Sequence, residues 1–188
     1  MTEDRVAADA RSSRSAAGVV RSGSGHELLG GAVGAELLAG SEETEGTASF
    51  IVRSLPPRAL GSPVHTHRFE DEWTYVLAGT IGAELGPRWV TAGPGDLIRK
   101  PRGIPHAFWN AGDHPARVLE VMTPGGFEEY VAQLGRLFDG ADEPDESKVA
   151  ALAAYYGLAI DASSVPRLVR EHGLRLHPGS SDERLDEA

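Results

Sequence analysis

The fold is decided by two short stretches, PVHTHRFEDEWTYVLAG (residues 63–79) and GDLIRKPRGIPHAFWN (residues 95–110), which we interpret as two halves of one site. In the first stretch, His65 and His67 are two residues apart. Residues at this spacing on a β-strand project from the same face, about 7 Å apart along the chain, so the two imidazoles can converge on one ion. Glu72 then begins an alternating run that predicts a second strand.

The second stretch supplies another imidazole. Glycine and proline residues punctuate its short apolar runs, and the residues from His106 to Asn110 are predicted to form a strand. His106 is therefore a further candidate ligand, while Glu70, Asp71 and Glu72 compete as the carboxylate. Imidazoles combined with one carboxylate suit Fe, Mn, Co, Ni, Cu or Zn, and the ligand types do not choose among these ions. The sequence thus predicts one divalent transition metal ion.

This pair of stretches resembles the two sequence motifs of the cupin superfamily. The residues that match the first motif, G-x5-H-x-H-x(3,4)-E-x6-G, are His65, His67, Glu72 and Gly79. The residues that match the second motif, G-x5-P-x-G-x2-H-x3-N, are Gly95, Pro101, Gly103, His106 and Asn110. Ala59 stands where the first motif has its leading glycine, and Gly61 lies two residues further on. The resemblance covers roughly residues 45–122, and so many positions in register make it specific.

The resemblance implies a mainly β fold, a cupin double-stranded β-helix barrel with C-terminal α-helices. It also implies that Glu72 is the carboxylate of the site. The implied metal ligands are His65, His67, Glu72 and His106.

Strand alternation extends this prediction to the surroundings of the metal site. Phe108 shares the face of His106, and Thr74 and Val76 share the face of Glu72, so these three residues are predicted to line a substrate pocket. Four aromatic residues are expected on the outer side, under the helices or at a subunit interface: Trp73, Tyr75, Trp89 and Trp109. Three basic residues beside the site are expected to form a solvated loop, with capture of an anion as the alternative: Arg99, Lys100 and Arg102.

Composition excludes several classes of function. The 188 residues suffice for one domain with a sizeable core, and the formal charge of 18 − 28 = −10 disfavours binding to nucleic acid or to an anionic membrane. The absence of cysteine excludes disulfides and thiolate metal sites. The first 20 residues lack the apolar segment of a secretory signal, and the longest nearly apolar run, residues 149–160, is too short to span a bilayer. We predict a soluble, cytoplasmic protein.

Four regions are predicted along the chain. They are a flexible N-terminal arm (1–24), a cupin β-barrel (25–123), a C-terminal helical extension (124–176) and a flexible tail (177–188). The barrel is expected to contain eight or more short strands, including a hairpin within residues 26–40. Further strands are predicted at residues 47–55, 80–85, 89–92, 96–100 and 117–122.

Three helices are predicted after the barrel. Apolar residues from Phe127 to Phe138 fall at helical spacing. Asp145 is the predicted N-cap of a second helix that ends at Gly157, and a third, short helix is expected from Pro166 to His172.

A closer resemblance lies in these helices and suggests a function. The segments MTPGGFEEYVAQLGRLF (residues 122–138) and AALAAYYGL (residues 150–158) are similar to those of quercetin 2,3-dioxygenase-like single-domain cupins. This implies a metal-dependent dioxygenase that oxidises a flavonol- or polyketide-like substrate, with Glu72 as both metal ligand and catalytic base. Because single cupin barrels often pair, a homodimer is also expected. Two alternatives stay open: a metal-dependent polyketide cyclase or isomerase, and a non-catalytic small-molecule-binding cupin.

Overall fold

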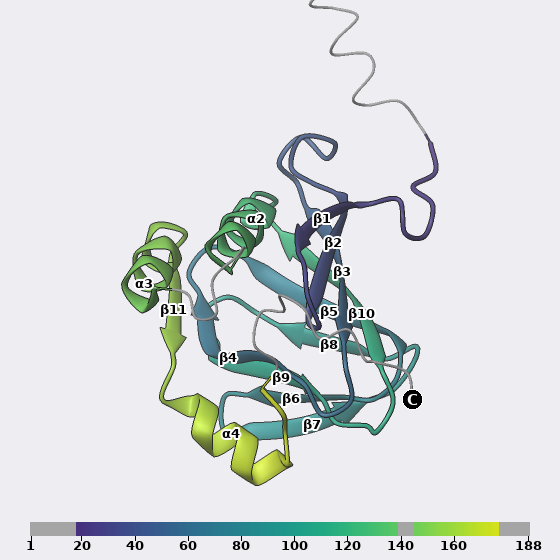
Figure 1. The fold of residues 1–188 in the computed structure, drawn as a ribbon. Coiled ribbons are helices and arrows are strands. Elements are labelled where there is room, and N and C mark those ends of the chain that lie inside the picture. Colours follow the sequence, from purple (N-terminus) through teal and green to yellow (C-terminus); the bar gives the residue numbers. More distant parts are fainter. Residues whose placement is uncertain (1–17, 139–144, 177–188) are drawn as a thin grey trace, which may run out of the picture.

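The computed structural model describes residues 18–138 and 145–176, and these residues form two antiparallel sheets with three helices (Figure 1). One sheet has the strand order β1-β2-β3-β10-β5-β8, and the other has the order β11-β4-β9-β6-β7. The strands are β1 (His26–Leu29), β2 (Gly34–Ala39), β3 (Ser49–Leu55), β4 (Leu60–His67), β5 (Asp71–Ala78), β6 (Ile81–Leu85), β7 (Arg88–Ala92), β8 (Leu97–Lys100), β9 (His106–Asn110), β10 (Ala116–Thr123) and β11 (Leu158–Asp161). The mainly β fold is confirmed. Most of the predicted arm and all of the predicted tail lie outside the described residues.

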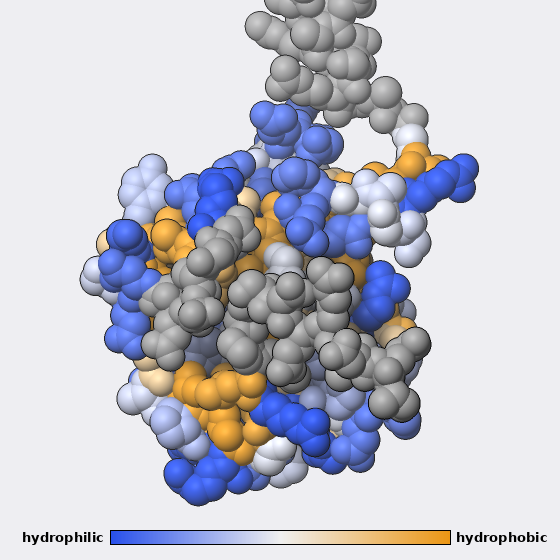
Figure 2. All heavy atoms as spheres, in the orientation of Figure 1, coloured by the Kyte–Doolittle hydropathy of each residue, from blue (hydrophilic) through white to orange (hydrophobic). Residues whose placement is uncertain are grey.

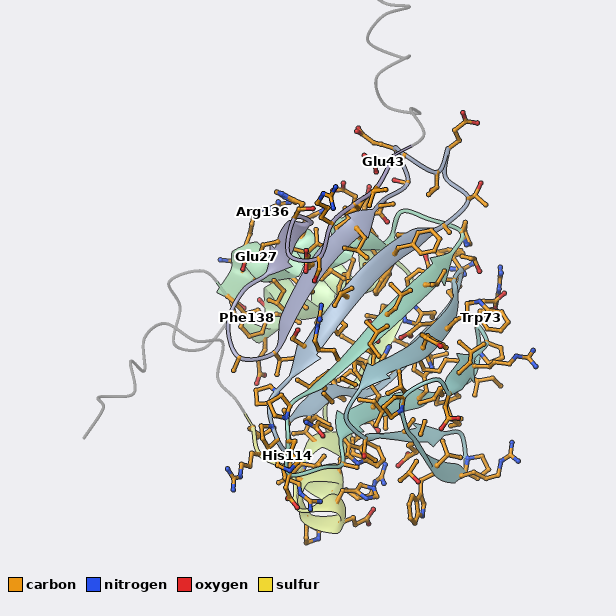
Figure 3. The ribbon with its side chains drawn as sticks, turned by 90° about the vertical axis from the view of Figure 1, so that its right-hand side faces the viewer. Glu27, Glu43, Trp73, His114, Arg136 and Phe138 are labelled. Carbon is orange, nitrogen blue, oxygen red and sulfur yellow. The ribbon has the colours of Figure 1, made fainter. Side chains whose placement is uncertain are left out.

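The two sheets enclose a core built by alternation along each strand. In β5 the side chains of Glu72, Thr74 and Val76 are buried, while Tyr75 between them is exposed. β10 repeats this pattern and pairs with both β3 and β5, at the centre of its sheet. Figure 3 shows Trp73 of β5 projecting away from the barrel. Period-two alternation in the sequence therefore fixes which side chains enter the barrel.

Close packing explains the departure from the first motif. Ala59, at the position of the motif's leading glycine, is fully buried. Two residues further on, position 61 needs a glycine, because an added Cβ would lie 2.5 Å from the Phe108 ring. Any larger residue at position 61 would displace that ring from the inside of the barrel.

Three helices cover one end and one side of the barrel (Figure 1). Helix α2 (Phe127–Phe138) packs on β1, and α3 (Glu146–Tyr155) packs on α2 and β11. The predicted N-cap is confirmed, because the Asp145 side chain accepts hydrogen bonds from the backbone of Ser147 and Lys148. Helix α4 (Ser164–His172) starts two residues before the predicted Pro166 and ends at Gly173, whose φ of 61° is left-handed.

Strand β11 is the one element of the described residues that the sequence did not predict. It pairs antiparallel with β4, placing Ile160 opposite His65. Its four residues continue the apolar run of α3, so periodicity alone does not separate the strand from the helix.

On its surface, the protein is mainly hydrophilic with smaller hydrophobic patches on the face shown in Figure 2. None of the described helices is long and apolar enough to cross a membrane.

Leu168 should be the main anchor of α4 on the barrel. Its side chain is fully buried in a cluster with Ala107, Trp109 and Leu174. Leu168→Ala is expected to lower the free energy of unfolding by about 2–4 kcal/mol, because it leaves a cavity in this cluster. Leu176→Ala is the matched control, since Leu176 is 59% exposed and the change should cost less than about 0.5 kcal/mol. Urea denaturation measures both, and equal losses would contradict the anchoring role.

Candidate metal centre

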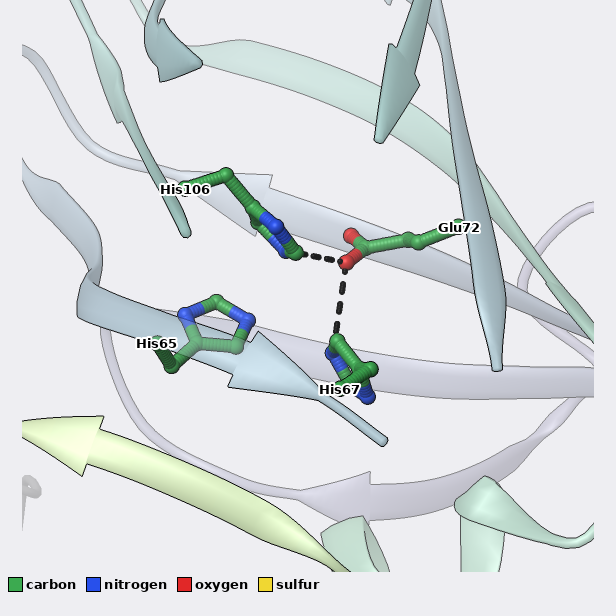
Figure 4. A group of neighbouring side chains, drawn as sticks. All are labelled: His65, His67, Glu72 and His106. Carbon is green, nitrogen blue, oxygen red and sulfur yellow. Dashed lines mark hydrogen bonds and ion pairs between the residues drawn. The ribbon is translucent and has the colours of Figure 1, made fainter. Parts of the chain in front are cut away.

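Four side chains converge inside the barrel, and they are the four predicted as metal ligands (Figure 4). His65 and His67 come from β4, Glu72 from β5 and His106 from β9. All four are buried, and their ligand atoms lie within 4.8 Å of one another. Two ligands at about 2.1 Å from one ion are at most about 4.2 Å apart, so small side-chain adjustments suffice for binding. The residues present fit a divalent metal ion.

Strand register produces this convergence from three separate segments. His65 of β4 lies directly opposite His106 of β9, and the ring centroids are 4.3 Å apart. His67 follows two residues later on the same face of β4. Glu72 belongs to the other sheet and reaches the cluster from across the barrel. The site therefore forms only when the two sheets close on each other.

Each imidazole is oriented through its Nδ1 atom. Nδ1 of His65 lies 2.9 Å from the carbonyl oxygen of Pro63, and Nδ1 of His106 lies 2.8 Å from that of Ile104. Nδ1 of His67 lies 3.3 Å from a carboxylate oxygen of Glu70. With an ion bound, an acceptor at each Nδ1 would keep the ring proton there and leave the Nε2 lone pair to the ion. This arrangement is typical of metal-binding histidines.

Glu72 divides its two oxygens between the histidines and a lysine. Its Oε2 atom lies 2.9 Å from Nε2 of His106 and 3.5 Å from Nε2 of His67. Its Oε1 atom accepts a hydrogen bond from Nζ of Lys100, which lies directly opposite in the β5–β8 register. Oε2 is therefore the oxygen that faces the imidazoles and would bind an ion.

The expectation of a solvated basic loop is wrong for Lys100, which is 1% exposed. Its Nζ atom lies 3.5 Å from Glu120 Oε1 and 4.7 Å above the Phe108 ring. Strand alternation in β8 explains its position, because Ile98 and Lys100 share the inner face while Arg99 is exposed. Thus the sequence contained the pattern that places this lysine inside the barrel.

Burial and charge shift the pKa values of these groups in different directions. Burial, followed by the neighbouring His106, lowers the pKa of His65 to about 3. Burial opposes protonation of His67 as well, but hydrogen bonds to Glu70 and Glu72 outweigh it and raise the pKa. For Glu72, burial favours the neutral acid, yet the Lys100 ammonium and the imidazole contacts hold the pKa well below its usual value. Burial and the charge of Glu72 raise the pKa of Glu120 to about 7.

A cavity of about 260 Å³ adjoins the cluster. His65, His67 and Glu72 form part of its wall, as does the predicted pocket residue Phe108. The other two predicted pocket residues, Thr74 and Val76, are buried but are not part of this wall. The sequence analysis did not identify Arg53 and Glu120, which do line the cavity. A lone glutamate within the otherwise apolar run of β10 was the pattern that could have indicated one of them.

A model of the cupin domain family matches residues 51–122 of the chain. Quercetin 2,3-dioxygenase of Bacillus subtilis is 27% identical over 128 residues, which is 68% of this chain. The chain spans only 37% of the length of that relative.

Solved structures share the barrel. KdgF from Halomonas sp. superposes with a TM-score of 0.53 at 16% identity, over 61% of this chain and 99% of that protein. A predicted oxalate decarboxylase from Thermotoga maritima gives a TM-score of 0.52 at 25% identity, over 57% of this chain and 99% of its own. A sugar phosphate isomerase from Silicibacter pomeroyi gives 0.50 at 22% identity, over 56% and 75% of the two chains. These similarities confirm the double-stranded β-helix fold.

Lys100 should stabilise the metal-free site. Lys100→Met removes the cation beside Glu72 and Glu120, and leaving buried carboxylates unpaired is expected to cost about 3–5 kcal/mol of stability. Because a bound cation would replace the missing positive charge, added divalent metal should raise the melting temperature of this variant more than that of the wild type. Arg99→Met, on the exposed face of β8, is the control and should behave as wild type. If added metal raised the melting temperature equally in the wild type, Lys100→Met and Arg99→Met, this role of Lys100 would be contradicted.

Metal-free protein should lose stability in acid through His65. Its pKa is about 3 in the folded protein, against about 6.5 in the unfolded chain. The contribution is fully present above about pH 6.5 and is lost as the pH falls through about 3, since only the unfolded chain binds the proton in this window. Glu120 acts with the opposite sign, because its raised pKa favours folding at low pH.

A His65 variant separates the contribution of His65 to the pH dependence of stability from that of Glu120. Urea midpoints measured between pH 7 and about 4 should fall less steeply for His65→Asn than for the wild type. His26→Asn changes an exposed histidine and should leave the slope unchanged. Parallel slopes for wild type and His65→Asn would exclude His65 as the source of the stability lost in acid.

Proposed function

The chain carries a cupin domain over residues 51–122, and from that premise we propose that it is a metal-dependent enzyme that oxidises or cleaves a small aromatic or enolic molecule with dioxygen. The observation that carries this proposal is the contact between the ligand cluster and the cavity. Three of the four candidate ligands form part of the cavity wall. A molecule held in the cavity would therefore lie against the metal centre, as catalysis by proximity requires.

The ligand set and the relative support the same class of chemistry. A bound transition ion supplies Lewis acidity and, where it is redox-active, chemistry with dioxygen. The similarity to quercetin 2,3-dioxygenase is modest in identity but includes most of the barrel and both of its motifs. We therefore propose dioxygen as the co-substrate.

The chain's own residues would orient the metal ligands and keep Glu72 ionised. The carbonyl groups of Pro63 and Ile104 and the carboxylate of Glu70 fix the three imidazoles. Lys100 fixes Glu72 and keeps it ionised. A carboxylate with a strongly lowered pKa is a good ligand but a weak proton acceptor. The pairing thus supports the ligand role of Glu72 more than its predicted role as catalytic base.

A homodimer in the cytoplasm remains part of the proposal. Tyr75, Leu77 and Leu97 are exposed on the outer face of the neighbouring strands β5 and β8, with Tyr75 directly opposite Leu97. An apolar outer face of this kind supports association with another subunit.

Oxygen uptake tests the proposed reaction. Protein loaded separately with Fe, Mn, Co, Ni, Cu or Zn is incubated with quercetin or with 2,3-dihydroxynaphthalene, a smaller aromatic diol. We expect oxygen consumption and ring-cleaved or oxidised product with at least one ion. His106→Ala removes one ligand, so its metal content and activity should both fall by at least about tenfold. His114→Ala, at a histidine outside the cluster, is the control and should retain both.

Three outcomes distinguish this reaction from its alternatives. Product that forms at the same rate without oxygen would replace the dioxygenase with a redox-neutral cyclase or isomerase. Stoichiometric binding without turnover would favour a non-catalytic binding protein. Unchanged metal content in His106→Ala would contradict the metal centre itself.

A further inference from the structure

The cavity beside the metal centre has an apolar wall interrupted by a few polar groups. Helix α2 contributes Tyr130, Leu134 and Phe138, and the β1–β2 hairpin contributes Ala32 and Val33. Figure 3 shows Phe138 at the end of α2, beside the hairpin. A wall of this composition favours an apolar ligand whose few polar atoms meet specific partners.

Its size limits the ligand. The 260 Å³ of space would hold roughly nine water molecules at about 30 Å³ each. It also falls just below the range of about 300–1,000 Å³ that is typical of sites for drug-sized ligands. One or two aromatic rings match the size of this enclosed space.

Two buried oxygen atoms in the wall have no hydrogen-bond partner. Among the described residues, four buried side-chain atoms are unpaired in this way: Ser49 Oγ, Ser62 Oγ, Thr74 Oγ1 and Glu120 Oε1. Ser62 and Glu120 line the cavity, whereas Ser49 and Thr74 do not. Because buried polar atoms in proteins are nearly always hydrogen-bonded, an unpaired oxygen on a residue that lines a cavity is a candidate partner for water or for a polar group of a ligand.

The surroundings of Glu120 keep Oε1 available. Its other oxygen, Oε2, lies 3.7 Å from Nη1 of Arg53. Lys100 Nζ lies 3.5 Å from Oε1, an ion pair without a hydrogen bond, and donates its hydrogen bond to Glu72 instead. Arg53 Nε donates to the carbonyl oxygen of Gly34. These contacts hold the Glu120 carboxylate in place and leave Oε1 without a hydrogen-bond donor among the described residues.

A flat surface lies beside this oxygen. The Phe108 ring forms part of the wall, with the Arg53 guanidinium 5.8 Å and the Lys100 ammonium 4.7 Å from its centroid. The backbone of Gly61 packs against one edge of the ring, where an added Cβ would lie 2.5 Å from it. An aromatic ligand can stack on or against such a ring, at centroid separations of about 4.5–7 Å.

We propose that the cavity binds a one- or two-ring aromatic molecule bearing hydroxyl groups, which form hydrogen bonds with Glu120 Oε1 and Ser62 Oγ. This names the substrate class for the proposed function and rests on it for the reaction. Binding itself requires no metal, so it can be tested separately. Glu120 is then the carboxylate that contacts the substrate, while Glu72 is the carboxylate that belongs to the metal site.

A matched pair of probes tests the hydrogen bonds. 2-Naphthol and 2-methylnaphthalene have nearly the same shape, but only the first has a hydroxyl group. In equilibrium dialysis with metal-free protein at about pH 8, above the pKa of about 7 of Glu120, 2-naphthol should bind at least about tenfold more tightly, as expected for a hydrogen bond to a charged acceptor. Equal affinities for the two probes, or binding of neither, would overturn the proposal.

Variants test whether the preference for 2-naphthol comes from Ser62 Oγ and Glu120 Oε1. Ser62→Ala, which changes no charge, should reduce the preference for 2-naphthol by about threefold, because a neutral hydrogen bond is weaker. Glu120→Gln should reduce it further, since it replaces a charged acceptor by a neutral one. Ser49→Ala removes an equally buried, unpaired hydroxyl outside the cavity and should leave the preference unchanged. An unchanged preference in both Ser62→Ala and Glu120→Gln would overturn the assignment.

The binding mode and the dioxygenase reaction can be contradicted separately. Selective 2-naphthol binding without oxygen uptake from any aromatic diol would support the binding site and count against the dioxygenase. Oxygen uptake by an enzyme that shows no preference for the hydroxyl probe would support the dioxygenase and overturn this binding mode.

Discussion

The rest of the site depends on the ionised Glu72 carboxylate being stable inside the barrel. Taking a carboxylate out of water is unfavourable unless opposite charge and hydrogen bonds compensate for it. Lys100 provides that compensation on one oxygen, and His67 and His106 lie against the other. The protein therefore carries its own counter-ion for the carboxylate, and the metal-free fold does not require an ion to neutralise it.

Residues of both sheets take part in stabilising the Glu72 carboxylate. Glu72 and Lys100 are cross-strand partners in one sheet, while the histidines come from the paired strands β4 and β9 of the other. A register shift of one residue in β5 or β8 would turn one of the two charges to the outside and leave the other buried alone. The charged pair thus disfavours alternative registers, in addition to preparing the site for a cation.

Much of this arrangement was predictable, and the failures have physical causes. Period-two alternation places His65 with His67 on one face, and the motif spacing identifies Glu72 and His106. Lys100 was misplaced because a lysine between two arginines was expected to be solvated, although alternation in β8 directs it inward. Strand β11 was missed because it pairs with β4, about 95 residues earlier in the sequence, and local sequence patterns do not reveal such long-range pairing. Buried ion pairs and long-range strand pairing both depend on tertiary context.

The charges inside the barrel form a row of contacts that connects the metal-ligand cluster with the apolar cavity. Along their ion-pair contacts Arg53, Glu120, Lys100 and Glu72 alternate in sign, and they come from four strands of one sheet, whose order is β3, β10, β5 and β8. The metal-ligand cluster lies at the Glu72 end, and Glu120 and Arg53 lie in the wall of the apolar cavity. Because each charge is balanced by its neighbours, Glu120 can keep one oxygen free without an isolated charge in the interior. A row of paired charges therefore lets one small barrel hold a cation site and an apolar cavity side by side.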